Sequence, residues 1–254
     1  MEHSADYVEL AAYGPGNELL KPFVKNTDLH YLMLNAAGVS LKNGDMLQTK
    51  ALTYSYKNGN SFRFPDLSCG PGEALLITGN SGMGKTTLLH LLAGILRPVS
   101  GEIDIDEYSI ASLSEKKLDR FRGQKIGLVL QQNHFVQSLH VLDNILLATK
   151  LAGKSANREK AVGLLQRLKL EDKIYNKPAE LSQGQQQLVS IARALINEQT
   201  LILADEPTSS LDDTHCHAVA ELLIEQAAIS HAALVIVTHD QRLQSIFGNT
   251  IALR

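Results

Sequence analysis

One glycine-rich stretch carries the residue types and the spacing of a phosphate-binding loop. It matches GxxxxGK[ST] and lies between an apolar run, Ala74–Thr78, and a helical pattern that begins near Thr86. Its glycines allow backbone amides to turn inward around phosphate oxygens, and the start of the helix adds its positive dipole end. We therefore expect the following residues to bind a nucleotide: Gly79, Asn80, Ser81, Gly82, Met83, Gly84, Lys85, Thr86 and Thr87.

Two side chains of this loop have specific expected roles. Lys85 is placed to reach the β- and γ-phosphates, and the hydroxyl of Thr86 is placed to ligate Mg²⁺. The alternative is a glycine-rich turn with an incidental lysine. The apolar run before the loop and the helical pattern after it favour a nucleotide site instead.

Two neighbouring carboxylates end a second apolar run, Leu201–Ala204. Asp205 and Glu206 would lie at the carboxyl end of a buried strand, which is where α/β sheets bind their ligands. Asp205 suits the Mg²⁺ shell, and Glu206 could polarise a water molecule for attack on a γ-phosphate. Alone, the pair could equally be a solvated strand end before a turn at Pro207, but the phosphate loop favours the catalytic interpretation.

The composition describes a globular chain. Of its 254 residues, 44% are hydrophobic and 20% are charged, which excludes a mostly disordered or collagen-like chain. The net charge is −3, so no nucleic-acid partner is expected. The two cysteines, Cys69 and Cys216, lie far apart and fit neither a disulfide framework nor a metal site, which favours a reducing compartment.

No segment of the sequence is expected to cross a membrane. A spanning helix needs about 20 mostly apolar residues, and the richest apolar run, Leu88–Leu96, is much shorter. The N-terminus carries Glu2, Asp6 and Glu9 where a secretory signal carries basic residues. We therefore expect the chain to reside in the cytoplasm.

Strand and helix patterns alternate from residue 47 onward, and this alternation predicts a layered α/β core. Residues 1–45 show neither the strand nor the helix periodicity of apolar residues over any sustained stretch. Two strand-like runs flank a turn at Asn58–Asn60 and predict an antiparallel hairpin: Leu47–Tyr56 and Ser61–Leu67. Solidly apolar runs predict strands buried on both faces of a parallel sheet: Ala74–Thr78, Ile126–Leu130, Leu201–Ala204 and Leu234–Thr238. Three- and four-residue spacing predicts helices: Thr86–Leu96, Arg158–Leu170, Gln185–Ile196 and His215–Ala228.

The phosphate loop, the carboxylate strand and several further motifs follow one another in the order found in the ATP-binding subunit of ABC transporters. The sequence resembles that family over residues 47–254. Leu181–Gln185 is similar to the signature motif of that family, and Ser210–Asp212 is similar to its D-loop. His239 resembles the switch histidine, and Gln131 resembles the Q-loop glutamine. Tyr56 resembles the aromatic residue on which adenine stacks.

The resemblance implies a fold and an assembly. The implied fold is a P-loop NTPase core with a mainly parallel sheet, an antiparallel β subdomain and an inserted α-helical subdomain at about 132–190. The ATPase domain would span residues 46–254, with residues 1–45 as an appended segment of unknown role. Two copies would pair head to tail with ATP and Mg²⁺ between them. An integral membrane permease subunit would dock near Asn133–Asn144 and hold the chain at the cytoplasmic face of the inner membrane.

The resemblance also implies roles for single residues. Glu206 would act as general base, and Lys85, Gln131 and His239 would act with it in catalysis. The implied Mg²⁺ ligands are Thr86, Gln131 and Asp205. In the dimer, the nucleotide would also meet residues of the second copy: Ser182, Gly184, Gln185 and Asp212.

Two of these assignments have neighbours that could replace them. Tyr54 lies on the same side of the expected strand as Tyr56, so either ring could meet the adenine. Gln132 directly follows Gln131, so the register of the Q-loop could shift by one residue.

The signature departs from the family pattern at two positions. Gln183 stands where the family usually has glycine, and Leu188 stands where many relatives have arginine. Ser182 and Gly184, which would face a γ-phosphate, are present. The departures therefore bear on turnover more than on nucleotide binding.

Other classes of ATPase share the phosphate loop. A chromosome-maintenance or DNA-repair ATPase would carry a long insertion before the signature, and the stretch between Lys85 and Leu181 is too short for one. The chain resembles instead the short branch that works in lipoprotein release, macrolide export and cell-division complexes. An ATPase that signals to a membrane, cell-wall or division partner without transport stays open as the alternative, and the identity of the membrane partner would distinguish the two.

Overall fold

The computed structural model describes residues 7–9, 23–25, 44–57 and 59–253. The chain divides into two units, Met1–Gly44 and Asp45–Arg254. In the first unit, strands β1 (Tyr7–Glu9) and β2 (Phe23–Lys25) pair antiparallel. The sequence patterns did not predict this pair, and residues 1–6, 10–22 and 26–43 of the appended segment lie outside the described residues.

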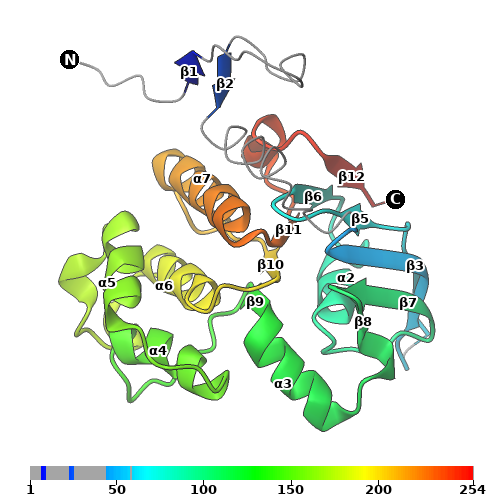
Figure 1. The fold of residues 1–254 in the computed structure, drawn as a ribbon, viewed down its shortest axis with the longest axis horizontal. Coiled ribbons are helices and arrows are strands. Elements are labelled where there is room, and N and C mark those ends of the chain that lie inside the picture. Colours follow the sequence, from blue (N-terminus) through cyan, green and yellow to red (C-terminus); the bar gives the residue numbers. More distant parts are fainter. Residues whose placement is uncertain (1–6, 10–22, 26–43, 58, 254) are drawn as a thin grey trace, which may run out of the picture. The chain divides into compact units, whose positions relative to one another are not determined.

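A parallel sheet forms the centre of the second unit (Figure 1). Its strands, in spatial order, are β12 (Thr250–Ala252), β6 (Ala74–Thr78), β11 (Ala233–Val237), β10 (Leu201–Asp205) and β9 (Ile126–Val129). Every neighbouring pair in this order runs parallel. The parallel sheet predicted from the apolar runs is therefore confirmed, with β12 as an additional strand at its edge.

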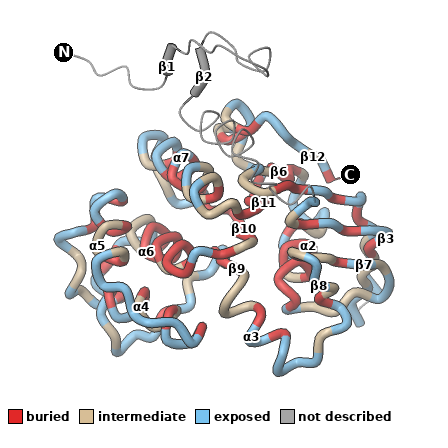
Figure 2. Tube along the Cα trace, viewed as in Figure 1, coloured by how far each residue is buried: buried red, intermediate tan, exposed pale blue. Residues whose placement is uncertain are grey.

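The apolar runs reflect burial on both faces of this sheet. In β11, Leu234 and Ile236 belong to one core cluster, whereas Val235 and Val237 belong to a second cluster. Successive side chains of a strand point to opposite faces, so each cluster occupies one side of the sheet. Figure 2 shows the buried residues along β10 and β11. A strand covered on both faces needs no polar alternation, which explains the continuous apolar pattern.

Helices pack on both sides of the sheet. On one side the core cluster includes residues of α4 (Val141–Leu151), α5 (Arg158–Arg167), α6 (Gln183–Leu195) and α7 (Asp213–Ser230). On the other side it includes residues of α2 (Lys85–Leu92) and α3 (Glu115–Lys125). The helices predicted from periodicity correspond to α2, α5, α6 and α7, whereas α3 and α4 were not predicted. Among the described residues, no helix is both long and apolar enough to cross a bilayer.

An antiparallel sheet packs beside α2. It contains β4 (Ser61–Arg63), β3 (Leu47–Ser55), β7 (Ser100–Ile105), β8 (Tyr108–Ser109) and β5 (Ser68–Cys69). The predicted hairpin is confirmed, because Ser55 pairs with Ser61 and Gly59 turns the chain with a φ of +93°. The strand predicted to reach Leu67 is wrong in length: β4 ends at Arg63. Pro65, which lacks an N–H, follows shortly and cannot extend the ladder.

The register of the parallel sheet gathers the ends of its strands. Ile77 of β6 pairs with Val237 of β11, and Val237 pairs with Asp205 of β10. Ala204 of β10 pairs in turn with Val129 of β9. The loops that leave these strands therefore begin at one edge of the sheet, which is the edge where α/β proteins bind ligands.

Candidate functional site

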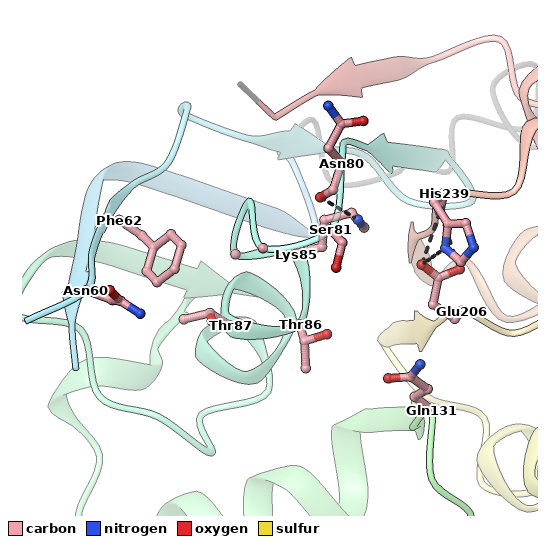
Figure 3. A pocket seen from close by; sticks show the side chains of 12 residues that line it. Asn60, Phe62, Asn80, Ser81, Lys85, Thr86, Thr87, Gln131, Glu206 and His239 are labelled. Carbon is pink, nitrogen blue, oxygen red and sulfur yellow. Dashed lines mark hydrogen bonds and ion pairs between the residues drawn. The ribbon is translucent and has the colours of Figure 1, made fainter. Parts of the chain in front are cut away.

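A pocket of about 690 Å³ opens at this edge of the sheet. Figure 3 shows side chains around it that come from segments far apart in the sequence. The residues expected from the sequence that line it are Asn80, Ser81, Gly82, Gly84, Lys85, Thr86, Thr87, Gln131, Glu206 and His239. The structure thus brings together the phosphate loop, the Q-loop glutamine, the strand-end glutamate and the switch histidine. Gln132 is exposed and does not line the pocket, which supports Gln131 in the Q-loop position.

The phosphate loop connects β6 to α2 and wraps around its own lysine. The ammonium group of Lys85 donates hydrogen bonds to the backbone oxygens of Gly79, at 2.6 Å, and Asn80, at 3.1 Å. Gly84 has a φ of +85°, and a Cβ added there would lie 2.6 Å from a ring carbon of Phe62. Only glycine fits this position without strain. Met83 is 39% exposed and, unlike its neighbours, does not line the pocket.

Oxygen atoms of the kinds that suit a divalent cation occur around the start of α2. The hydroxyl of Thr86 forms a hydrogen bond with the carboxylate of Asp205, which is only 2% exposed. Burial raises the pKa of Asp205, the nearby Glu206 acts in the same direction, and the Thr86 hydrogen bond opposes them. Gln131 lines the same pocket. Hydroxyl, carboxylate and amide oxygens suit Mg²⁺, so the residues present fit that ion.

Glu206 turns the chain at the end of β10 and is held from β11. Its φ is +50°, a left-handed conformation that few non-glycine residues adopt. Its carboxylate accepts hydrogen bonds from the hydroxyl of Thr238, at 2.7 Å, and from the backbone N–H of His239, at 3.1 Å. Nδ1 of His239 also lies 2.7 Å from Oε1 of Glu206 (Figure 3). The catalytic candidate is therefore 6% exposed, while 70% of the His239 side chain faces solvent.

Aromatic rings from the β3–β4 hairpin lie near the phosphate-loop helix, and one of them lines the pocket. The ring of Tyr56 contacts Tyr54 edge-on at 4.8 Å, and its hydroxyl lies 3.0 Å from the hydroxyl of Thr87. Tyr56 therefore reaches the phosphate-loop helix, although it does not line the pocket itself. Phe62 does line it, together with Asn60. The sequence patterns missed both residues, and the alternation of Phe62 with Phe64 in the run Ser61–Leu67 was the available signal for Phe62.

The nucleotide contacts expected from the second copy line a separate cavity of about 500 Å³. It contains the signature and the D-loop motif: Ser182, Gln183, Gly184, Gln185, Leu188, Ser210, Leu211 and Asp212. A Cβ on Gly184 would lie 3.0 Å from the backbone oxygen of Ser210, so a glycine allows the two motifs to approach closely. Leu188, at the position where many relatives have arginine, is 4% exposed and packs in the core.

Both motifs are ordered by helix capping. Ser182 is the N-cap of α6: its hydroxyl accepts from the N–H of Gln185 at 3.2 Å, and the Gln185 side chain accepts from the N–H of Ser182 at 3.0 Å. Asp212 is the N-cap of α7 and accepts from the N–H of His215 at 2.9 Å. Hydrogen bonds from His215 lower the pKa of Asp212. The cavity therefore presents the N-terminal ends of two helices, which favour an anion.

Comparisons with known proteins agree with this geometry. Residues 63–209 match the protein family described as "ABC transporter". A lipoprotein-releasing system ATP-binding protein LolD from Legionella pneumophila (strain Paris) is 37% identical over 217 residues, which cover 83% of this chain and 96% of that protein. A LolD from Buchnera aphidicola subsp. Schizaphis graminum is 40% identical over 173 residues, which cover 67% of this chain and 76% of that protein.

Solved structures show the same similarity. The ATP-binding cassette MJ0796, in a dimeric post-hydrolysis state bound to ADP and Pi, superposes with a TM-score of 0.77. It is 33% identical, and the match covers 82% of this chain and 94% of that one. The protein cbiO1 from Clostridium perfringens, part of the ABC transporter complex cbiONQ, superposes with a TM-score of 0.72 at 27% identity, and the match covers 84% of this chain and 86% of that one. The chain therefore belongs to the ABC transporter family and is one of its ATP-binding, ATP-hydrolysing subunits.

Proposed function

We propose that two copies of this cassette bind ATP between them head to tail, and that hydrolysis drives a separate integral membrane permease. The observation that carries the proposal is the division of the expected nucleotide contacts between two cavities of one chain. Lys85 and Thr86 line the first, and Ser182 and Gly184 line the second. A second copy can supply the contacts that one copy keeps apart from its own phosphate loop.

Within each composite site, the chain's own residues divide the chemistry. Lys85 would bind the β- and γ-phosphates, and Glu206 would take the proton of the attacking water. Thr86, Asp205 and Gln131 would hold Mg²⁺, which when bound neutralises charge on the phosphates. Because Nδ1 of His239 faces Glu206, its Nε2 is the ring nitrogen left for the γ-phosphate. Tyr56 and Phe62 would pack against the adenine ring of ATP.

The dimer can be tested through the signature serine. The Glu206→Gln protein should dimerise with ATP, because it binds without hydrolysing, and adding Ser182→Arg should prevent dimerisation. Ser155→Arg, at an exposed loop position, is the matched control and should dimerise normally. Size-exclusion chromatography with and without MgATP measures the result. Equal dimerisation with Ser182→Arg would contradict the head-to-tail arrangement.

Mixed dimers test the same arrangement from the opposite direction. A Ser182→Arg chain combined with a Lys85→Ala chain contains one composite site in which both halves are intact. The mixture should therefore recover ATPase activity that neither variant has alone. A mixture as inactive as its components would count against sites shared between two chains.

A groove of about 430 Å³ between α4, β9 and α6 is the proposed docking site of the permease. It adjoins the segment Asn133–Asn144, whose backbone is held by hydrogen bonds from the side chains of Asn144 and Arg193. The Asn144 side chain accepts from the N–H of Val136 at 2.9 Å and donates to three backbone oxygens of the segment. Arg193 of α6 donates to the backbone oxygen of His134 and lies over the ring of Phe135.

Apolar side chains at the rim of this groove suggest how the permease binds. Val136 is 44% exposed and Leu151 is 77% exposed. Such a partner would hold the chain at the cytoplasmic face of the inner membrane. We expect Leu151→Glu to abolish co-purification with the membrane subunit and to leave the basal ATPase unchanged. Ile229→Glu, at a similarly exposed apolar position on α7, is the control and should still co-purify. Retained co-purification of Leu151→Glu would exclude this groove.

A further inference from the structure

Arg242 forms a fork of hydrogen bonds directly after the loop that carries His239. It lies in a short 3₁₀ turn, Gln241–Ser245. Its guanidinium donates to Oδ1 of Asp240 at 2.9 Å and to Oδ2 at 2.7 Å. Such charge-assisted, two-point contacts restrict both partners more than a single hydrogen bond does.

The same guanidinium also reaches the neighbouring loop that follows Glu206. It donates to the backbone oxygen of Leu211 at 3.2 Å and to that of Thr208 at 3.3 Å. Asp240 makes the parallel connection, because its carboxylate accepts from the hydroxyl of Thr208 at 2.7 Å. Arg242 and Asp240 together therefore tie the loop after β10 to the loop after β11.

Both loops contact Glu206, one at its backbone and the other at its carboxylate. The first loop begins at Glu206, and Ser209 donates through its hydroxyl to the backbone oxygen of Glu206 at 3.1 Å. The second loop holds the Glu206 side chain through Thr238 and His239. The far end of the first loop, from Ser210 to Asp212, lines the signature cavity. Arg242 thus lies between the signature cavity and the residues that orient Glu206.

We infer that Arg242 is a positioning residue, which locks the D-loop segment Thr208–Asp212 to the His239 loop and so makes the orientation of Glu206 depend on the signature cavity. The inference rests on the proposed role of Glu206 in hydrolysis. Arg242 acts through Asp240 and the two loops and touches no reacting atom. When the second copy fills the signature cavity, a displacement of the D-loop segment would then change the orientation of Glu206 through the hydrogen bonds of Arg242.

A simple surface ion pair does not account for the arrangement. Arg242 also pairs with Asp213 at 2.7 Å, but that carboxylate is 85% exposed, and exposed pairs contribute little. The Asp240 side chain is only 11% exposed. Its pKa falls to about 2, chiefly because of the Arg242 hydrogen bonds, with burial opposing and Thr208 adding to the effect. The strong contact is therefore the one that joins the two loops.

Steady-state kinetics on the full-length protein tests the inference. Arg242→Gln should lower kcat roughly 3- to 30-fold, the range of coupling that such networks carry. KM for ATP should stay within about two-fold, since no group that binds nucleotide is removed. Arg242→Lys should recover part of the loss, because lysine restores the charge but cannot contact Asp240 and both backbone oxygens at once.

Two control variants separate this role from a loss of surface charge. Asp213→Asn removes only the exposed partner and should leave kcat within two-fold of the original. Arg167→Gln removes an arginine that pairs with Glu225 on α7, away from the two loops, and should leave kcat unchanged. A kcat for Arg242→Gln no lower than that of Arg167→Gln would overturn the inference. A proportional rise in KM would also overturn it, because that result indicates a role in binding.

The outcome for Glu206→Gln distinguishes this inference from the proposed function. If Glu206→Gln is inactive while Arg242→Gln is fully active, only the inference fails. If Glu206→Gln turns over normally, the assigned role of Glu206 fails whatever Arg242 does. Should Arg242→Gln not fold, Arg242→Lys decides: a lowered kcat at unchanged KM supports the positioning role, and an unchanged kcat refutes it.

Discussion

The carboxylate of Glu206 and the imidazole of His239 lie in direct contact, with Oε1 of the glutamate 2.7 Å from Nδ1 of the histidine. The two residues follow neighbouring parallel strands, β10 and β11, whose register sets Asp205 opposite Val237. Their contact orients the carboxylate that is proposed to activate water. It also leaves Nε2 of His239 as the nitrogen that can face a nucleotide.

We expect Glu206→Gln to separate ATP binding from hydrolysis. Removal of the general base should slow hydrolysis by roughly 10²- to 10⁴-fold, while Lys85 and the phosphate loop keep their geometry and bind ATP as before. A fluorescent-nucleotide titration and a phosphate-release assay measure the two effects. Glu221→Gln, at an exposed position of α7, is the control and should leave both quantities unchanged. Near-normal turnover of Glu206→Gln would remove this residue from its assigned role.

The aromatic rings predict a graded loss of nucleotide affinity. Stacking of a base on an aromatic ring contributes about 1–3 kcal/mol. We therefore expect Tyr56→Ala and Phe62→Ala each to weaken ATP binding, because Tyr56 reaches Thr87 and Phe62 lines the pocket. Tyr54→Ala should change affinity little, since Tyr54 lies within β3 and its ring packs edge-on against Tyr56. Calorimetric titration of the three variants decides the assignment, and a larger loss for Tyr54→Ala would transfer the adenine role to Tyr54.

The Asp240 carboxylate predicts a pH-dependent part of the stability. Arg242 and Thr208 lower its pKa from 3.8 to about 2 in the folded protein, against the opposing effect of burial. A lowered pKa means that the stabilisation is complete above pH 3.8 and is lost as the pH falls toward 2. Asp240→Asn should therefore lower the free energy of unfolding by about 1.5–3 kcal/mol at pH 7.

Urea unfolding at several pH values measures this effect. The difference between the original protein and Asp240→Asn should be constant from pH 7 to pH 5 and should shrink below about pH 4. Asp213→Asn, at a carboxylate that is 85% exposed, is the control and should cause a small difference at every pH. A difference for Asp240→Asn that does not change with pH would contradict the assignment to the ionised carboxylate.

The division of the chain into two units predicts that the first unit is dispensable for catalysis. A chain beginning at Asp45 keeps the hydrogen bonds that Asp45 accepts from Gln48, at 2.8 Å, and Ser68, at 2.6 Å. Every residue assigned to ATP, Mg²⁺ or the dimer lies at Tyr56 or beyond. We expect this chain to fold and to hydrolyse ATP within a few-fold of the full-length rate, by thermal melting and ATPase assays.

The competing view is that apolar residues of the appended segment, from Leu29 to Leu34, cover a face of the antiparallel sheet. These residues lie outside the part of the chain that the structure describes. If they do cover that face, the chain beginning at Asp45 will aggregate. A chain beginning at Ala51 is the control, because it lacks the part of β3 that pairs with β7 from Leu47 to Lys50, and it should not fold.

Local patterns in the sequence determined the parallel sheet and the identity of the phosphate loop. A strand buried on both faces must be apolar throughout, so β6, β9, β10 and β11 were visible as continuous runs. Helix α3 was not visible, because only Leu118 and Phe121 of this highly charged segment are buried. A periodicity that depends on two residues does not distinguish a helix from a solvated loop.

The sequence by itself also determined which residue types could bind ATP and Mg²⁺, since the glycines, lysine, threonine and carboxylates stand at motif spacing. Only the tertiary structure decided how they are grouped. It placed Phe62 against Gly84, set Glu206 beside His239, separated the signature from the phosphate loop, and joined two loops through Arg242. These relationships depend on strand register and on contacts between residues far apart in the chain, and spacing along a sequence carries no measure of either.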